Sequence, residues 1–137
     1  MELSGAVTDD LDMTVGYSHF TAKTDDETLN INQPRSLFNL FASYSVPQHR
    51  ALTLGGGVNW QSSLFANNLT TPAGLPSEFE QSDYTLVNLF GRYQFTPELS
   101  LQVNVKNLLD EKYYSNVNGY GVYGEPASIS STLRYEF

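Results

Sequence analysis

The chain has 137 residues, enough for one domain at most. Its 7 Lys and Arg against 15 Asp and Glu give a net charge of -8, which argues against a nucleic-acid-binding surface. There is no Cys, and no run of residues approaches the roughly 18 apolar positions of a membrane helix, so these residues hold neither a thiolate metal site nor a helical span.

Seven segments alternate apolar and polar residues with the two-residue period of a β-strand. In chain order they are residues 2–8, 11–23, 36–46, 51–62, 83–96, 99–108 and 127–137. In the last segment, Tyr135 and Phe137 fall on one face, whereas Arg134 and Glu136 fall on the other. Aromatic residues make up 13% of the chain and charged residues only 16%, which favours a β-rich fold.

The connections between these segments alternate between short and long. Short turns follow the first, third and fifth segments, and long polar loops cover residues 24–35, 65–82 and 118–126. Antiparallel hairpins with this pattern place all short turns at one end of a sheet and all long loops at the other. Most of the segments run about 10 to 14 residues, and a tilted strand needs about 9 to 11 to cross a bilayer. The pattern predicts an all-β fold, an antiparallel up-and-down transmembrane β-barrel segment.

Aromatic residues on the apolar face gather near the ends of the predicted strands. Near the short turns these are Tyr44, Tyr93, Phe95, Tyr135 and Phe137, and nearer the long loops they are Tyr17 and Trp60. Such belts are typical of the two membrane interfaces of a barrel. Seven strands leave two unpaired edges, which are unfavourable in hydrocarbon because each unpaired backbone group costs several kcal/mol. We therefore expect a piece of a larger closed barrel.

One segment has a family resemblance. Residues 101–114, Leu-Gln-Val-Asn-Val-Lys-Asn-Leu-Leu-Asp-Glu-Lys-Tyr-Tyr, resemble the NVxNLFDxxY segment near the end of TonB-dependent outer-membrane receptors. The sequence Tyr-Gly-Glu-Pro at 123–126 is similar to the YGxPR loop that follows it in the family. Leu109 and Ala127 depart from the family pattern, which has Phe and Arg at these places. The nearest branch is the ferric-siderophore receptors of the ferripyoverdine and ferric-coprogen type.

The resemblance implies a multi-pass β-barrel in the outer membrane of a Gram-negative cell. Residues 1–137 would then form the C-terminal part of the receptor barrel, about seven strands of a barrel of about 22, with the N-terminal plug domain absent. The implied function is TonB-dependent uptake of ferric siderophores. The implied partners are membrane lipid, a ferric siderophore and, only through parts of the receptor absent here, TonB. The implied protein is a transporter and not an enzyme.

Two alternatives remain open at this point. A small soluble β-barrel that closes by dimerisation and binds a lipophilic ligand would show the same alternation, because it would bury the apolar face. A structural or adhesive outer-membrane barrel fragment would also share the pattern.

The candidate ligand-binding residues lie in the long loops. Tyr120 and Tyr123 are candidates for stacking on or hydrogen-bonding to a siderophore, and Phe65, Asn67 and Asn68 are candidates for the lining of the vestibule mouth. The alternative is that the loop tyrosines pack on each other.

The sequence gives no support for catalysis, a metal site or a cofactor. It lacks a G-x-S-x-G motif, and its two histidines, His19 and His49, are 30 positions apart at opposite strand ends. The spacing of its acidic residues does not match an EF-hand.

Overall fold

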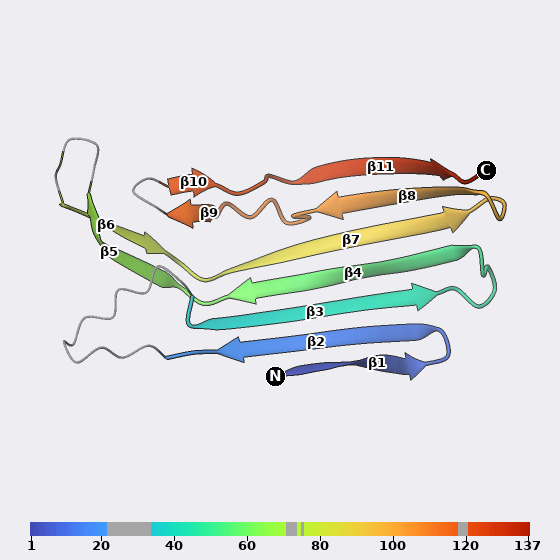
Figure 1. The fold of residues 1–137 in the computed structure, drawn as a ribbon, viewed down its shortest axis with the longest axis horizontal. Helices are drawn as coiled ribbons and strands as arrows, with labels where there is room; N and C mark the ends of the chain where they lie inside the picture. The colour runs from blue at the N-terminus through green and yellow to red at the C-terminus, as the bar shows by residue number, and fades with distance from the viewer. Residues whose placement is uncertain (22–33, 71–73, 75, 118–120) are drawn as a thin grey trace.

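The computed structural model describes residues 1–21, 34–70, 74, 76–117 and 121–137. One antiparallel sheet of seven strands dominates this part of the chain (Figure 1). In spatial order its strands are β1 (Glu2–Thr8), β2 (Leu11–His19), β3 (Ser36–Ser45), β4 (Leu52–Gln61), β7 (Tyr84–Gln94), β8 (Leu99–Lys106) and β11 (Ser128–Tyr135). No helix of the described residues is long and apolar enough to cross a membrane.

The seven predicted strands and their antiparallel order are confirmed. The strands are 7 to 11 residues long, so several are shorter than expected. The second ends at His19 rather than at residue 23, which lies outside the described residues. The short turns lie at one end of the sheet and the long connections at the other, as predicted (Figure 1).

The prediction of a long loop at residues 65–82 is wrong. A two-stranded hairpin occupies it, formed by β5 (Leu64–Thr70) and β6 (Pro76–Gln81). Part of the predicted loop at 118–126 belongs to a second hairpin, formed by β9 (Tyr114–Val117) and β10 (Gly121–Tyr123). Sequence patterns missed both hairpins because their ladders are short and their registers shift, which breaks the two-residue period. We call these two hairpins the outer hairpins.

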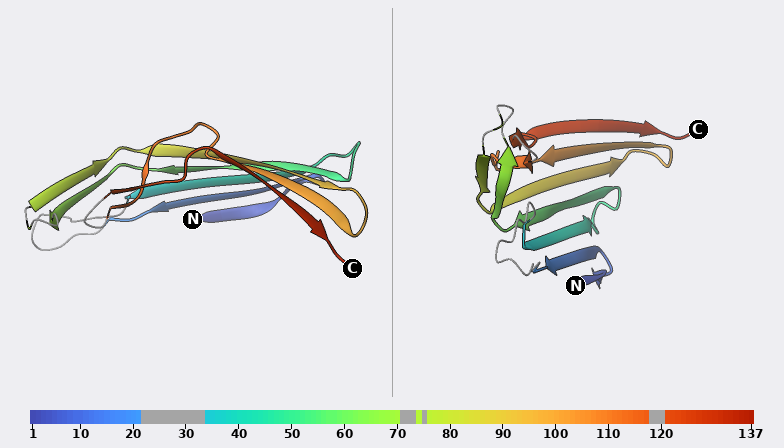
Figure 2. Two further views of the ribbon diagram at one scale, coloured as in Figure 1. Left: turned by 90° about the horizontal axis from the view of Figure 1, so that it is seen from above. Right: turned by 60° about the vertical axis from the view of Figure 1, so that its left-hand side comes forward.

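Apolar residues of neighbouring strands align on one face of the sheet. Val15, Leu40 and Val58 lie opposite one another on β2, β3 and β4, and Val87 continues the row on β7. This outer face stays uncovered, and Leu89 beside the row is 44% exposed. The sheet is strongly curved, as two further views show (Figure 2).

Polar residues align on the opposite, inner face. Asn39 and Asn59 lie directly opposite each other on β3 and β4. A hollow of about 740 Å³ opens on this face, and polar side chains form about half of its lining. They include Thr14, Asn39, Asn59, Asn88, Asn104 and Ser130. The alternation in the sequence therefore separates an apolar outer face from a polar, hollowed inner face.

Two aromatic rings interrupt the polar inner face. The rings of Phe41 and Phe90 stack with centroids 5.8 Å apart and an interplanar angle of 5°. The ring of Phe90 lies over Gly55, where a Cβ atom would come within 2.5 Å of the ring and of the Ala42 carbonyl oxygen. The central Gly-Gly-Gly run of β4 thus brings a neighbouring ring close to the backbone, as a glycine inside a strand often does.

The sheet has almost no interior of its own. Among the described residues, Leu64 is the single buried hydrophobic residue, and no side chain is fully buried. Leu64 lies in an outer hairpin and not in the seven-stranded sheet. A soluble domain buries one face of such a sheet, and within this chain the described residues do not cover the apolar face.

Candidate functional site

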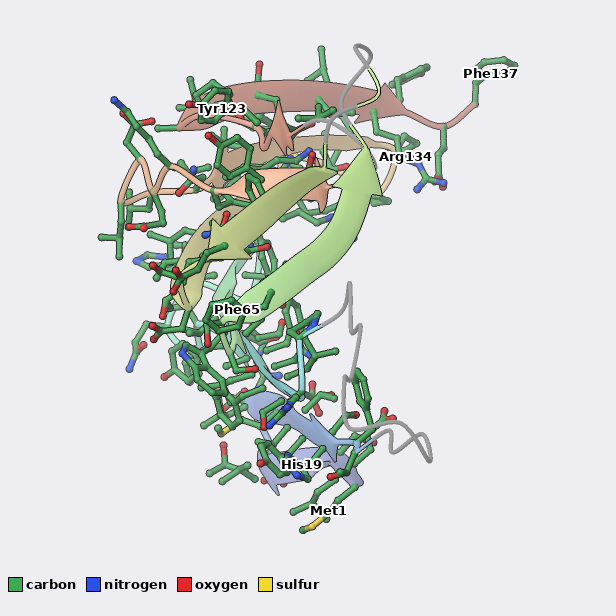
Figure 3. The ribbon with its side chains drawn as sticks, turned by 90° about the vertical axis from the view of Figure 1, so that its left-hand side faces the viewer. Met1, His19, Phe65, Tyr123, Arg134 and Phe137 are labelled. Atoms are coloured by element: carbon green, nitrogen blue, oxygen red, sulfur yellow. The ribbon has the colours of Figure 1, made fainter. Side chains whose placement is uncertain are left out.

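The outer hairpins extend the sheet beyond its long-connection end. The β5–β6 hairpin continues β4 and β7, whereas the β9–β10 hairpin lies between β8 and β11 along the chain. Figure 3 looks along the strands from this end, with Phe65 and Tyr123 near the viewer and Phe137 at the far end. Of the candidate ligand-binding residues, Phe65, Asn67 and Asn68 lie in β5 and Tyr123 lies in β10.

A cluster of apolar and aromatic side chains joins the two hairpins. The ring of Tyr114 meets that of Phe79 edge to face at 4.8 Å, and both rings pack against Leu64. The ring of Tyr123 stacks on Tyr114 at 4.6 Å, and the Tyr114 hydroxyl donates a hydrogen bond of 3.2 Å to the Tyr123 hydroxyl. We call Leu64, Phe79, Tyr114 and Tyr123 the outer aromatic cluster. Aromatic pairs of this geometry are favourable by about 0.5 to 1.5 kcal/mol beyond the area that they bury.

The hydrogen bond within the cluster affects the acidity of Tyr114. It is the main cause that raises the pKa of Tyr114 above its ordinary value, followed by burial and by the nearby charge of Tyr123. A neutral hydroxyl that donates a hydrogen bond is harder to ionise. The cluster therefore favours the protonated form of Tyr114.

A buried amide links the backbones of the two hairpins. Gln81, at the end of β6, is only 7% exposed. Its Oε1 atom accepts a hydrogen bond of 2.9 Å from the Tyr114 backbone N–H, and its Nε2 atom donates to the Ser82 carbonyl at 3.0 Å. Both ends of the amide are thus satisfied, as a buried amide requires. Sequence patterns gave no signal for this residue, because a Gln in a predicted polar loop is expected to be exposed.

The segment that carries the family resemblance forms a compact connection at the base of β9. Asn107 is 3% exposed and has a positive φ of 48°. Its Nδ2 atom donates to the carbonyls of Glu111 at 2.9 Å and Glu125 at 3.0 Å, and its Oδ1 atom accepts from the Glu111 N–H at 2.9 Å. Asp110, also with a positive φ, accepts a hydrogen bond from the Ala127 N–H. These bonds join β8 to the start of β11, so the motif has a structural role.

A glycine completes this connection. The Gly124 N–H donates to the Tyr113 carbonyl at 2.8 Å, and the ring of Tyr113 lies so close to Gly124 that any Cβ atom there would overlap it. The same ring packs on Tyr84 with centroids 4.5 Å apart. Tyr113 thus packs inward on β7, which accounts for the glycine of the Tyr-Gly-Glu-Pro sequence.

The structure places only some of the predicted ligand-binding residues. Tyr123 is 67% exposed and Phe65 is 59% exposed. Asn67 and Asn68 lie in β5, but their side chains are outside the described residues, and so is Tyr120. Because Tyr123 stacks on Tyr114, the alternative that loop tyrosines pack on each other holds for this pair, although much of the Tyr123 ring is still accessible.

The predicted aromatic belts lie at the two ends of the outer face. At the end of the long connections, Tyr17, Phe38 and Trp60 lie opposite one another across β2, β3 and β4. Phe38 completes this row and was not predicted as part of it. The remaining aromatics lie at the short-turn end and are exposed: Tyr44, Tyr93, Phe95, Tyr135 and Phe137. That these rings form membrane belts stays a prediction.

Comparisons with known proteins identify relatives over the whole chain. The family model of the TonB dependent receptor-like β-barrel matches residues 1–108. The chain is 38% identical over 140 residues to a ferric-pyoverdine BN7/BN8 receptor of Pseudomonas putida, which covers 100% of this chain and 16% of that protein. It is 33% identical to the ferripyoverdine receptor of Pseudomonas aeruginosa, over 99% of this chain and 17% of the relative. The chain therefore spans about one-sixth of the length of these relatives.

Solved structures share this fold. A crystal structure of the ferripyoverdine receptor of the Pseudomonas aeruginosa outer membrane, bound to ferripyoverdine, superimposes with a TM-score of 0.88 at 33% identity. The match covers 99% of this chain and 19% of that one. The ferric-catecholate import receptor Fiu of E. coli matches with a TM-score of 0.76 at 25% identity, over 99% of this chain and 20% of that receptor.

Proposed function

Since the chain belongs to the TonB-dependent receptor family, we propose that it forms part of the barrel wall of a receptor that imports ferric siderophores across the outer membrane. The single observation that carries this proposal is the match to ferric-pyoverdine receptors over the full length of the chain. The separation of an apolar outer face from a polar, hollowed inner face supports it, because a barrel wall contacts lipid on one side and water on the other. The protein is a receptor in this proposal and not an enzyme.

The proposed ligand is a ferric siderophore of the pyoverdine class. The relatives named as ferric-pyoverdine receptors support this choice. In this proposal Phe65 and Tyr123 contact the ligand from the outer hairpins, where their rings are accessible. Tyr120, Asn67 and Asn68 remain predicted contacts. The aromatic belts, including Tyr17 and Trp60, would lie at the two membrane interfaces.

The test is an uptake experiment with the full-length receptor that contains this chain. Cells that lack their own ferripyoverdine receptor express it, and uptake of ⁵⁵Fe-labelled ferripyoverdine is measured with and without a functional tonB gene. The proposal predicts accumulation that depends on tonB and a receptor that is recovered in the outer-membrane fraction. Outer-membrane recovery without binding or uptake would instead indicate a structural or adhesive barrel. Recovery in the soluble fraction would contradict the membrane placement.

A further inference from the structure

The two outer hairpins come from distant parts of the chain but share one packed interface. Gln81 and Tyr114 are 33 residues apart in sequence, and the hydrogen bond between them joins β6 to β9. The outer aromatic cluster lies beside this bond, with Leu64 and Phe79 from one hairpin and Tyr114 and Tyr123 from the other. In the described part of the chain, this is the place where a hydrophobic side chain is buried.

The β9–β10 hairpin depends on this interface for its position. β9 has four residues and β10 has three, and their ladder contains a register shift. A two-stranded hairpin is marginal in water even when it is longer and regular. The Tyr114 ring is packed on Phe79, and a Cβ atom at Gly121 would come within 2.7 Å of the same ring. The β9–β10 hairpin is therefore ordered by its packing against the β5–β6 hairpin.

From these contacts we infer that the outer hairpins act as one rigid ligand-contacting element, and that Gln81 is the positioning residue that locks them together. The ligand role of this element rests on the function proposed above. Phe65 and Tyr123 lie on different hairpins, and the lock fixes the distance between them. A large ligand that touches both rings then does not have to order one hairpin against the other. Preorganisation thus removes this free-energy cost of binding.

Gln81 suits this role because it fixes the position of the β9 backbone and does not itself contact the ligand. Its side chain is buried, so it does not contact a ligand in the vestibule. Its acceptor oxygen fixes the Tyr114 N–H at the first residue of β9. Replacement by Leu removes this acceptor and leaves the part-buried Tyr114 N–H without its partner. Replacement by Glu keeps an oxygen at this place but removes the donor to Ser82.

The experiment measures the distance between the hairpins in the full-length receptor. Spin labels on Glu80→Cys and Val122→Cys, both at exposed positions, report the distance distribution by pulsed electron paramagnetic resonance. We expect a narrow distribution in the parent, a broad one in Gln81→Leu and an intermediate one in Gln81→Glu. The matched control is Gln94→Leu, at the other end of β7, which should leave the hairpin distance narrow. The heat-modifiability of the barrel on a gel verifies that each variant is folded.

A second arm measures the affinity of the same variants for ferripyoverdine. Gln81→Leu should weaken binding about tenfold, because the ligand must then order the hairpins itself. Gln81→Glu should recover part of this loss, and Gln94→Leu should bind like the parent. If the parent distance is already broad, or if Gln81→Leu leaves it narrow, the lock is refuted. A broadened distance with unchanged affinity refutes the positioning role of Gln81. The distance distributions could also change as expected in a receptor that does not bind ferripyoverdine. This result would support the rigid element and refute the proposed ligand.

Discussion

At the scale of single residues, Asn107 shows why an Asn occurs at this point of the motif. Its side-chain amide makes three hydrogen bonds with the backbones of Glu111 and Glu125, and its own backbone has a positive φ. Asn tolerates a positive φ better than most residues, and a buried carbonyl or N–H left without a partner costs about 1 to 3 kcal/mol. The residue therefore combines a backbone conformation with a set of bonds that few other side chains provide.

We predict that Asn107→Ala lowers the free energy of unfolding of the full-length receptor by at least about 3 kcal/mol, because it removes these bonds and strains the backbone. Asn107→Gly separates the two effects, since Gly accepts a positive φ. We expect Gly to be less harmful than Ala by about 1 kcal/mol. Denaturant unfolding in detergent micelles measures both variants. Equal losses for Ala and Gly would show that the positive φ carries no strain.

The Tyr114–Tyr123 pair gives a prediction of pH dependence. β9 lies beyond the seven-stranded sheet, and the pKa of Tyr114 is raised there, first by the hydrogen bond with Tyr123 and then by burial. A raised pKa in the folded state means that the pair contributes its full stability below the ordinary tyrosine pKa of about 10. That stability is lost as the pH rises through the raised pKa.

Tyr123→Phe should therefore bring the pKa of Tyr114 down toward its ordinary value. The titration is followed by nuclear magnetic resonance of tyrosine labelled with ¹³C at Cζ, with the Tyr114 signal assigned by its loss in Tyr114→Phe. Tyr44→Phe, at the opposite end of the sheet, should leave the titration of Tyr114 unchanged. An unchanged Tyr114 titration in Tyr123→Phe would mean that the hydroxyl pair does not form.

Sequence analysis named some candidate residues and missed others for a physical reason. Tyr123 and Phe65 were named because aromatic residues in a polar loop are conspicuous, and their contact with a ligand stays a prediction. Gln81 was missed because its importance comes from burial and from a contact with a backbone N–H 33 residues away, which no local pattern encodes. Asn107 was recognised as part of a motif, but its sequence does not reveal that its role is to hold backbone groups.

At the scale of elements, the two faces of β8 provide a test of membrane placement. Val103 lies near the middle of the strand on the outer face, opposite Gly91 and Ser131. Asn104, one residue further, lies on the inner face at the edge of the hollow. A charge in hydrocarbon is costly, whereas a charge in a water-filled lumen is solvated.

Val103→Arg is thus predicted to destabilise the folded barrel by about 2 to 4 kcal/mol, the cost of Arg at the bilayer midplane. Asn104→Arg is the matched control and should cost far less. Reversible unfolding of the full-length receptor in phospholipid vesicles measures both. Similar losses at the two positions would contradict a lipid-facing outer side.

The strands of the large sheet were predictable, and those of the outer hairpins were not. A strand with one apolar face and one polar face must alternate along its length, so the pattern of β3, β4 or β7 is visible in sequence. The outer hairpins lie beyond the end of the seven-stranded sheet, where this alternation is not required. Their register shifts, the Asn67-Asn68 pair and the Pro at residue 76 are typical of loops, and packing between the hairpins overrides those local signals.

At the scale of the whole molecule, the sheet has two open edges. β1 and β11 are its outermost strands, and each has one side without a neighbouring strand among the described residues. Exposed apolar residues lie on the outer face of strands at both edges and in the middle of the sheet, among them Leu3, Leu54, Leu89 and Leu133. Open edges and a large apolar face promote pairing between chains.

We therefore predict that residues 1–137 expressed alone do not form a stable monomer in detergent. Size-exclusion chromatography with light scattering should show oligomers or aggregates, and the chain should not resist sodium dodecyl sulfate without heating. The full-length receptor, prepared in the same way, should run as a compact species on an unheated gel. A monodisperse monomer that unfolds cooperatively would show that this arc of sheet closes on itself.

Few side chains of the described residues are buried, and this bears on how much sequence change such a sheet tolerates. A globular core ties each residue to the shapes of its neighbours, so substitutions there must compensate one another. A side chain that faces fluid lipid has no fixed partner to match, and most apolar replacements satisfy it equally well. The match to a solved relative fits this expectation, because the two chains superimpose with a TM-score of 0.88 although only 33% of their residues are identical.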